Sequence, residues 1–317
     1  MKRLITLLLI FFLLPVSVLA EDPVLVDRTN DLTEEYVFPE GTDVLEVVFP
    51  RIYSSDCAII RFGNEVMMID ASTSNPTMVD RIRTAMNSMG VDHIDIAFNS
   101  HPHDDHLDGF PFVQDYAPIG RFVTAFPADF NGRMKALTAF AAEHDIPVVQ
   151  VTDGDVLTLG AHGEVTLTVI QRWINPKWGA NDLSAMLLIR YGDRTMLFTG
   201  DVEHRAEQAM INDPPACGLK ADIIKYPHHG QQPLVNGFFN AVSPELAIMT
   251  GAYEVMENGK QYLTRHGVPY LLSFRGLTRL RTDGTTWVVD YMHENDPDRD
   301  TTINPQYATT TDLLVEP

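Results

Sequence analysis

A short cluster of histidines and aspartates constrains this chain more than any other feature of its sequence. Five side chains that commonly bind metal ions fall within six consecutive residues, and they are His101, His103, Asp104, Asp105 and His106. A mostly apolar run at residues 94–98 precedes them, so the cluster should form a loop at the end of a buried strand. Imidazole nitrogens and carboxylate oxygens are the usual protein ligands of zinc and similar ions. The cluster therefore predicts a metal site rather than a solvated polar loop.

Two other strand ends carry residues of the same kind far along the chain. Asp201 follows an apolar run at 195–198, and His228 and His229 follow another at 223–224. A lone Gly-Asp pair is a weak signal, because aspartate is common in turns. Two histidine loops and a strand-end aspartate are together what a site for two metal ions would require.

The remaining pattern indicates an α/β protein. Short β-rich runs separated by turns extend from residue 44 to residue 291, and helices are predicted at 77–89, 132–144 and 203–211. The strand-rich segments fall into two halves with helices between them. This pattern predicts an αββα sandwich, in which two β-sheets pack together and helices lie on the outer faces.

The histidine cluster resembles a known signature. The spacing of His101, His103, Asp105 and His106 matches the metal motif of the metallo-β-lactamase superfamily. Asp70, at the end of an earlier apolar run, resembles the aspartate that this superfamily places beside its metal loop. The resemblance implies the αββα fold, with two mixed sheets, and a metal-dependent hydrolase.

Further segments are similar to one branch of that superfamily. The residues around Asn181 and Asp201, and the stretch 221–230, look most like the hydrolase domain of the ComEC-type DNA-uptake proteins. The resemblance covers residues 44–291, nearly all of the chain after its first forty residues. We therefore expect one hydrolase domain at 41–293.

The superfamily pattern, carried over to this sequence, assigns ligands to two metal positions. The implied ligands are His101, His103, Asp105, His106, Asp201 and His229. The two histidines of the His-x-His motif would hold one ion, and the Asp-His pair and a histidine of the later loop would hold the other. Asp201 would bridge the two ions. We favour His229 over His228 as the ligand from the later loop, with His228 behind it.

Two more roles follow from the same resemblance. Asp105 would be the catalytic residue that orients the attacking water, and Asp70 would orient the metal loop through hydrogen bonds rather than bind metal. A divalent ion lowers the pKa of a bound water to about 7 and so supplies the nucleophile. Zinc is the expected metal, with manganese and iron as alternatives.

The sequence departs from the superfamily pattern at one ligand. Many members carry a further histidine that completes the first metal position, whereas the equivalent stretch here begins with Asn181. His144 and His162 lie in the same interval but lack the matching context. The first ion could be absent, weakly held, or completed by Asn181 or water, so we expect one or two ions.

The ends of the chain predict export. Residues 1–20 begin with two basic residues, continue with a short apolar run and end in alanine, which is typical of a cleaved signal peptide and too short for a membrane span. A polar N-terminal arm is expected at 21–40 and a polar tail at 294–317. We therefore expect a periplasmic or extracellular protein, in which Cys57 and Cys217 either pair or remain free thiols.

The charge of the chain bears on its substrate. Asp and Glu number 43 against 23 Lys and Arg, which argues against binding long nucleic acid. The similarity to the competence branch favours a small or short phosphodiester, or a related ester. Hydrolysis of an amide, lactam or lactone is the alternative activity, because one scaffold serves many substrates. A metal-binding module without turnover is the alternative outside enzyme chemistry.

Overall fold

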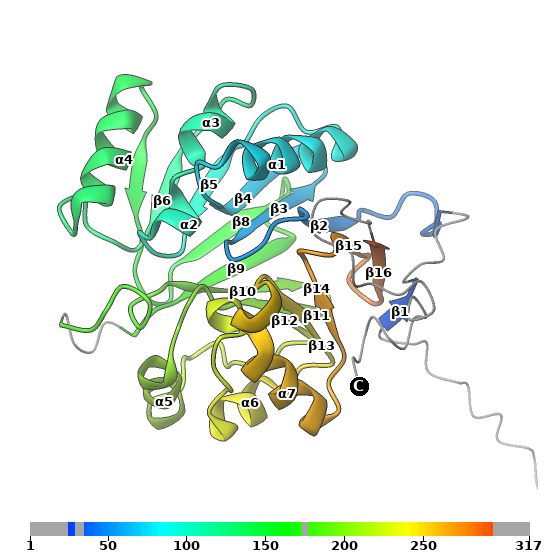
Figure 1. Cartoon of the computed structure of the whole chain (residues 1–317). Coiled ribbons are helices and arrows are strands. Elements are labelled where there is room, and N and C mark those ends of the chain that lie inside the picture. The colour runs from blue at the N-terminus through cyan, green and yellow to red at the C-terminus, as the bar shows by residue number, and fades with distance from the viewer. Residues whose placement is uncertain (1–24, 29–34, 173–176, 294–317) are drawn as a thin grey trace, which may run out of the picture.

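Two β-sheets lie face to face, and helices cover both outer faces of the pair (Figure 1). The computed structural model describes residues 25–28, 35–172 and 177–293. The predicted αββα sandwich is confirmed. The predicted signal peptide and C-terminal tail lie outside the described residues, whereas residues 25–27 of the expected arm form a strand.

The first sheet has nine strands. In spatial order they are β1 (Leu25–Asp27), β16 (Trp287–His293), β15 (Gly276–Thr282), β2 (Leu45–Phe49), β3 (Cys57–Phe62), β4 (Glu65–Ala71), β5 (Ile96–Asn99), β6 (Phe122–Thr124) and β7 (Val148–Gln150). The four strands from β4 to β7 are parallel, and β3 runs antiparallel to both of its neighbours, β2 and β4. The start of β3 therefore lies at the same edge as the end of β4.

The second sheet has seven strands. In spatial order they are β14 (Tyr270–Leu272), β13 (Leu246–Met249), β12 (Ile223–Lys225), β11 (Arg194–Phe198), β10 (Met186–Tyr191), β9 (Val165–Ile170) and β8 (Val156–Leu159). The four strands from β11 to β14 are parallel. Each sheet thus contains a parallel run whose carboxyl ends meet at one edge, which is where open α/β sheets place their ligand sites.

The helices form the two outer layers. Those on the first sheet are α1 (Pro76–Met89), α2 (Asp104–Leu107), α3 (Phe110–Gln114) and α4 (Gly132–Glu143), and those on the second are α5 (His204–Asn212), α6 (Asn236–Val242) and α7 (Glu257–His266). One apolar core lies between the sheets, and one lies under each helical layer. Among the described residues, no helix has the length and apolar character needed to cross a bilayer.

A close backbone contact fixes the corner between α2 and α3. Gly109 lies between these helices and donates its N–H to the carbonyl oxygen of Ser72 at 3.2 Å. A Cβ atom at Gly109 would lie 1.8 Å from the carbonyl oxygen of Ala71 at the end of β4. The corner can therefore approach β4 only because residue 109 has no side chain.

We expect Gly109→Ala to destabilise the fold by about 3 kcal/mol, because a backbone carbonyl cannot move aside as a flexible side chain would. Gly132→Ala at the start of α4 is the matched control, since a Cβ atom added there would have no neighbour within 4 Å, and we expect its effect to stay within about 1 kcal/mol. Urea unfolding of both variants measures the difference. Equal stabilities would contradict this account of the corner.

Candidate metal centre

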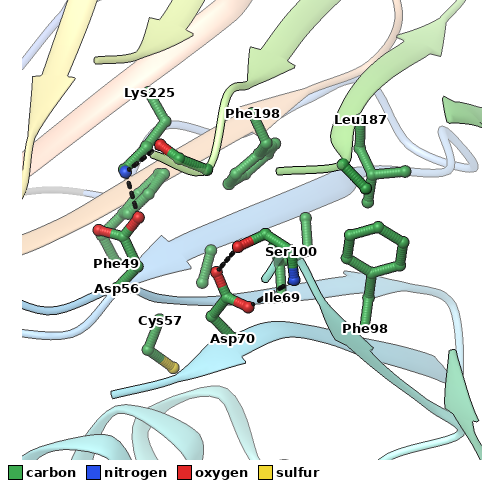
Figure 2. A pocket seen from close by; sticks show the side chains of 13 residues that line it. Phe49, Asp56, Cys57, Ile69, Asp70, Phe98, Ser100, Leu187, Phe198 and Lys225 are labelled. Atoms are coloured by element: carbon green, nitrogen blue, oxygen red, sulfur yellow. Dashed lines mark hydrogen bonds and ion pairs between the residues drawn. The ribbon is translucent and has the colours of Figure 1, made fainter. Parts of the chain in front are cut away.

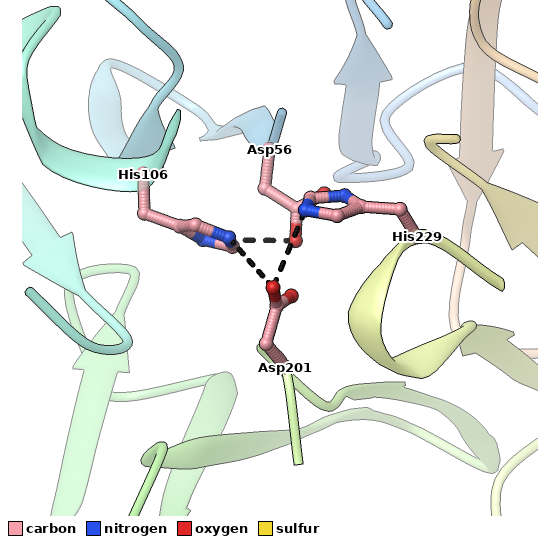
Figure 3. Close-up of side chains that lie close together, drawn as sticks. All are labelled: Asp56, His106, Asp201 and His229. Atoms are coloured by element: carbon pink, nitrogen blue, oxygen red, sulfur yellow. Dashed lines mark ion pairs between the residues drawn. The ribbon is translucent and has the colours of Figure 1, made fainter. Parts of the chain in front are cut away.

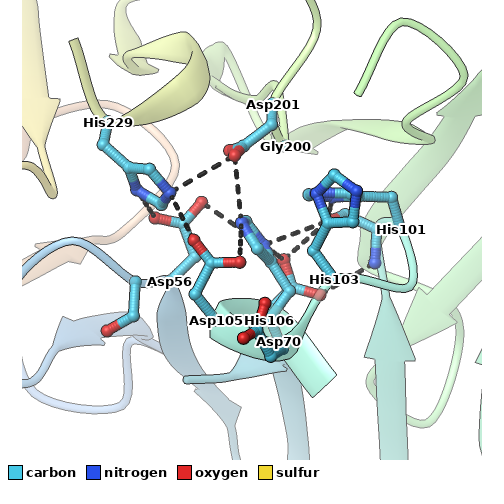
Figure 4. Close-up of polar contacts among 12 residues, drawn as sticks. Asp56, Asp70, His101, His103, Asp105, His106, Gly200, Asp201 and His229 are labelled. Carbon is cyan, nitrogen blue, oxygen red and sulfur yellow. Dashed lines mark hydrogen bonds and ion pairs between the residues drawn. The ribbon is translucent and has the colours of Figure 1, made fainter. Parts of the chain in front are cut away.

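The predicted site residues gather at the edge where the parallel strands of both sheets end (Figure 4). Asp70 lies near the end of β4, and the histidine cluster follows β5 and runs into α2. Asp201 follows β11, and His228 and His229 lie in a short 3-10 turn after β12, Pro227–Gly230. Residues far apart in sequence thus meet because the two sheets bring their carboxyl ends together.

Asp70 holds the histidine loop in place. Its Oδ2 lies 2.7 Å from Nδ1 of His106 and accepts a hydrogen bond from the Ser100 hydroxyl at 2.6 Å. Its Oδ1 accepts from the backbone N–H of Ser100 at 2.8 Å and from the Asn99 amide at 3.2 Å. Asp70 is buried and has a left-handed backbone, with φ of 55°. This geometry fits the expected orienting role, because the carboxylate faces the far nitrogen of His106.

His229 is held in a similar way by residues of both sheets. Its Nδ1 lies 3.1 Å from the Thr250 hydroxyl and 3.3 Å from Oδ1 of Asp56. Its Nε2 lies 3.1 Å from Oδ2 of Asp105 and 3.3 Å from Oδ2 of Asp201. Nδ1 of the ring thus contacts Thr250 and Asp56, while Nε2 faces the carboxylates of Asp105 and Asp201.

The inner nitrogens of His106 and His229, which are both buried, converge on Asp201. His106 Nε2 lies 3.2 Å from Oδ2 of Asp201, the same oxygen that His229 faces. His106 Nε2 is buried and makes no hydrogen bond of acceptable geometry with any residue that the structure describes. A buried ring nitrogen that faces a carboxylate without bonding it fits a cation between them. These donors therefore suit a divalent metal ion.

Asp56 also lies within the donor cluster. One donor atom each from Asp56, His106, Asp201 and His229 falls within 4.8 Å of all the others (Figure 3). Asp56, however, lies beside the Nδ1 atoms, at 3.8 Å from that of His106 and 3.3 Å from that of His229. Asp105 lies on the Nε2 side of both rings. We therefore place Asp105 among the groups that could hold an ion, with Asp56 behind His229.

The carboxylates set the electrostatics of the cluster. Burial alone would lower the pKa of both His106 and His229, but the nearby carboxylates, Asp201 first among them, outweigh burial and raise each pKa well above its usual value. Burial would raise the pKa of Asp105, yet the adjacent histidines hold it at about 2. The carboxylates thus stabilise positive charge at these two histidines, either as protons on the rings or as a metal ion that displaces those protons.

His101 and His103 lie together beside the buried cluster. Nε2 of His101 lies 3.0 Å from Nδ1 of His103, and Nδ1 of His101 lies 3.1 Å from the Ser100 hydroxyl. His101 is fully buried, whereas His103 is half-buried. Burial, and then the charge of His106, lower the pKa of His101 well below its usual value, so this imidazole is neutral and able to bind a metal.

A buried lysine completes the polar centre. Lys225, the last residue of β12, forms an ion pair with Asp56, lies 3.5 Å from Oδ1 of Asp201 and donates to the carbonyl oxygen of Gly200 at 3.0 Å. Burial would lower the pKa of Lys225, but Asp56 and Asp201 outweigh it and raise the pKa. The ammonium group therefore remains charged inside the protein.

Asn181 and His228 form a second group beside the buried donors, and both are partly buried. The Asn181 amide donates to Oε1 of Glu203 at 3.1 Å and lies 3.3 Å from Nε2 of His228. Nδ1 of His228 lies 3.2 Å from the same Glu203 oxygen. His228 also lies close to Asp201, because Nε2 of His228 is 3.9 Å from Oδ2 of Asp201.

A small cavity of about 10 Å³ lies between the sheets, behind the donors (Figure 2). Its lining includes Asp56, Cys57, Asp70, Ser100 and Lys225. A cavity of this size has room for about one water molecule and none for a substrate.

The thiols of Cys57 and Cys217 are both free, so they do not form a disulfide in this structure.

Sequence reasoning missed Asp56, Lys225 and Glu203. Lysine is almost never fully buried unless it is paired, so nothing in the local pattern marked Lys225 as a partner of the site. The position of Asp56 immediately before β3 is the signal that could have found it, because β3 is antiparallel to β4 and begins where Asp70 lies. Glu203 could have been found from its place two residues after Asp201.

We expect Asp70→Asn to weaken zinc binding by about 10–100-fold, because residues that hold a ligand histidine contribute on that scale. Asparagine tolerates the left-handed backbone of this position, so the change removes charge with little strain. Competition with a chromogenic chelator measures the affinity. Asp80→Asn on the exposed face of α1 is the control, and equal affinity in both variants would contradict the role of Asp70.

We expect Lys225→Met to lower the free energy of unfolding of the metal-free protein by about 3–5 kcal/mol, because Asp56 would keep a buried charge without its partner. Adding Asp56→Asn should recover part of that loss. A double-mutant cycle from urea unfolding tests both statements. If the effects of the two changes on the free energy of unfolding were additive, the ion pair would contribute nothing to stability.

Known proteins resemble this chain in sequence and in fold. It is 24% identical to ComE operon protein 3 of Bacillus subtilis over 66% of its own length and 26% of that protein. It is 25% identical to the competence protein ComA of Neisseria gonorrhoeae over 71% of its length and 29% of that protein. The chain thus spans between a quarter and a third of these two curated relatives.

A solved structure and a family model agree on the fold. A variant of CmlA β-hydroxylase, a protein of Streptomyces venezuelae, superposes with a TM-score of 0.51 at 15% identity, covering 78% of this chain and 55% of the other. The sequence model of the metallo-β-lactamase superfamily matches residues 51–237. The predicted resemblance is confirmed, and the chain belongs to the metallo-β-lactamase superfamily.

Proposed function

We propose that this metal-dependent hydrolase is exported and cleaves a phosphodiester or a related ester in a small or short substrate. The observation that carries the proposal is the convergence of two buried imidazole Nε2 atoms on Oδ2 of Asp201, beside the carboxylate of Asp105. Similarity to two competence proteins supports a phosphodiester over an amide or lactone. The signal-like first twenty residues support export.

The ligand chemistry favours zinc, with manganese or iron as alternatives. A divalent ion in this site would acidify a water and polarise the oxygen of the substrate. The residues proposed to hold one or two such ions are His101, His103, Asp105, His106, Asp201 and His229. Each of the two buried histidines on Asp201 has a carboxylate beside its far nitrogen, which fixes the nitrogen that faces the ion.

Asp105 is proposed to orient the attacking water. Its side chain is 28% exposed, whereas that of Asp201 is 2% exposed. Asp105 can therefore contact buried His229 and a water that enters from solvent at the same time. Because its carboxyl group has a pKa of about 2, it is ionised at neutral pH and accepts a hydrogen bond from that water.

The charge of the chain supports a small substrate. Acidic side chains outnumber basic ones by 43 to 23, and long nucleic acid would have to approach against this field. A short phosphodiester carries one or two negative charges, which bound metal ions can neutralise locally. The substrate is therefore proposed to enter as a small molecule or a short chain.

We expect the mature protein to hydrolyse bis(p-nitrophenyl) phosphate with added zinc or manganese, and to lose that turnover on chelation. His103→Ala should reduce turnover by more than the roughly 10–100-fold typical of residues behind the ligands. His204→Ala is the control, since His204 is exposed and its Nε2 lies 2.7 Å from the carbonyl oxygen of Pro233, away from the donors.

Two outcomes would contradict the proposal. Full activity in His103→Ala would remove this residue from the site. No phosphodiester turnover from protein that demonstrably holds metal would reject the substrate class, and amide, lactone and carboxylic ester substrates would then be tested. If metal-loaded protein cleaved none of these, a metal-binding module without turnover would replace the enzyme.

A further inference from the structure

We propose that His228 replaces the histidine that is missing at Asn181 and completes the metal position of His101 and His103. The inference rests on the proposed metal-dependent function and assigns both histidines of the Pro-His-His-Gly turn to metal binding, one to each ion. His229 would serve the ion of Asp105 and His106. His228 would serve the other ion, with Asp201 between the two.

The first support is the direction of three imidazoles. Nε2 of His106, His229 and His228 lie 3.2 Å, 3.3 Å and 3.9 Å from the same atom, Oδ2 of Asp201. A carboxylate oxygen approached by three ring nitrogens is suited to bridge two cations. His228 therefore faces the bridging group that His229 faces, rather than lying behind His229.

The second support is the partner of the outer nitrogen. Nδ1 of His228 lies 3.2 Å from Oε1 of Glu203. Asp70 stands beside Nδ1 of His106 in the same manner, at 2.7 Å, and Asp56 stands beside Nδ1 of His229, at 3.3 Å. Carboxylates in this position fix the tautomer of metal-bound histidines. His228 thus has a carboxylate beside its outer nitrogen, as the two other histidines have, although Nδ1 of His228 forms no hydrogen bond with any residue that the structure describes.

The third support is backbone strain. His228 and His229 have φ values of 46° and 55°, so two consecutive residues with side chains adopt the left-handed conformation. Such residues are strained and persist where the surrounding structure requires them. The unusual turn directs both rings toward Asp201, which explains why His228 is not in a relaxed conformation.

The fourth support is the environment of Asn181. Its amide nitrogen lies 3.3 Å from Nε2 of His228, and its Oδ1 is buried without a hydrogen bond to any described residue. The side chain at the position of the missing histidine thus contacts the ring nitrogen that is proposed to bind the ion. Binding of the ion by Nε2 would replace this contact with the Asn181 amide, so Glu203 is left to position His228 and Asn181 is not required to be a ligand itself.

The test counts metal ions rather than turnover. Demetallated wild-type protein is titrated with zinc and, after gel filtration, its metal content is measured by mass spectrometry. We expect two ions per wild-type chain, one in His228→Ala and two in the control His204→Ala. Glu203→Gln should retain both ions but bind one of them about 10–100-fold more weakly. His228→Asn, which tolerates the left-handed backbone, repeats the test, and circular dichroism verifies that each variant is folded.

The results separate this inference from the proposed function. Two ions in folded His228→Ala and His228→Asn, or a single ion in the wild type, would overturn the role of His228 even if the enzyme cleaves phosphodiesters. Two ions in the wild type and one in the variants would support that role even if no phosphodiester is cleaved. Wild-type protein that binds no zinc, manganese or iron would reject both.

Discussion

The ion pair between Lys225 and Asp56 joins the two sheets at the edge where the donors collect. Asp56 precedes β3 in the first sheet, and Lys225 ends β12 in the second, so neither partner can move without its sheet. A buried charge without a partner is costly, and the pair therefore fixes the separation of the two strand ends. Lys225 also lies beside Asp201, which leaves the other oxygen of Asp201 directed toward the histidines.

In this arrangement, the residues that support the histidine rings differ from those that face the solvent. The residues behind the histidines, Asp70 and Asp56, are buried and bonded to backbone or hydroxyl groups around them. The residues in front, Asp105 and His103, are partly exposed. Rigid groups therefore hold the rings, and the solvent-facing groups are free to meet a substrate. A loose supporting layer would misplace the donors and weaken any ion they hold.

The sequence predicted the architecture and the central motif for a physical reason. The candidate ligand histidines follow apolar runs that can be recognised locally, and both sheets contain apolar strands. β15 cannot be recognised from its own residues, because Arg279 and Arg281 interrupt its apolar pattern, and both pair with buried Asp290 of β16. The predicted strand at 94–98 also begins later, as β5 at Ile96, since Ile94 forms only an isolated bridge with Ile119.

Contacts between distant segments could not be predicted in the same way. Asp56 and His229 belong to distant parts of the chain, and only the closure of the sandwich brings the two together at 3.3 Å. No local pattern distinguishes Lys225 from a lysine at an exposed strand end, because its burial depends on the facing sheet. The role of Glu203 likewise depends on the left-handed turn at His228, which is not visible in composition or periodicity.

The origin of the donors on both sheets has a thermodynamic consequence. A ligand that binds only the closed sandwich adds its binding free energy to the stability of the whole fold, in proportion to the logarithm of its concentration. The layers on either side of the central core would then open together rather than separately, because separating them would release the ion. Metal supply would thereby set the lifetime of the folded protein against proteolysis, as well as its activity.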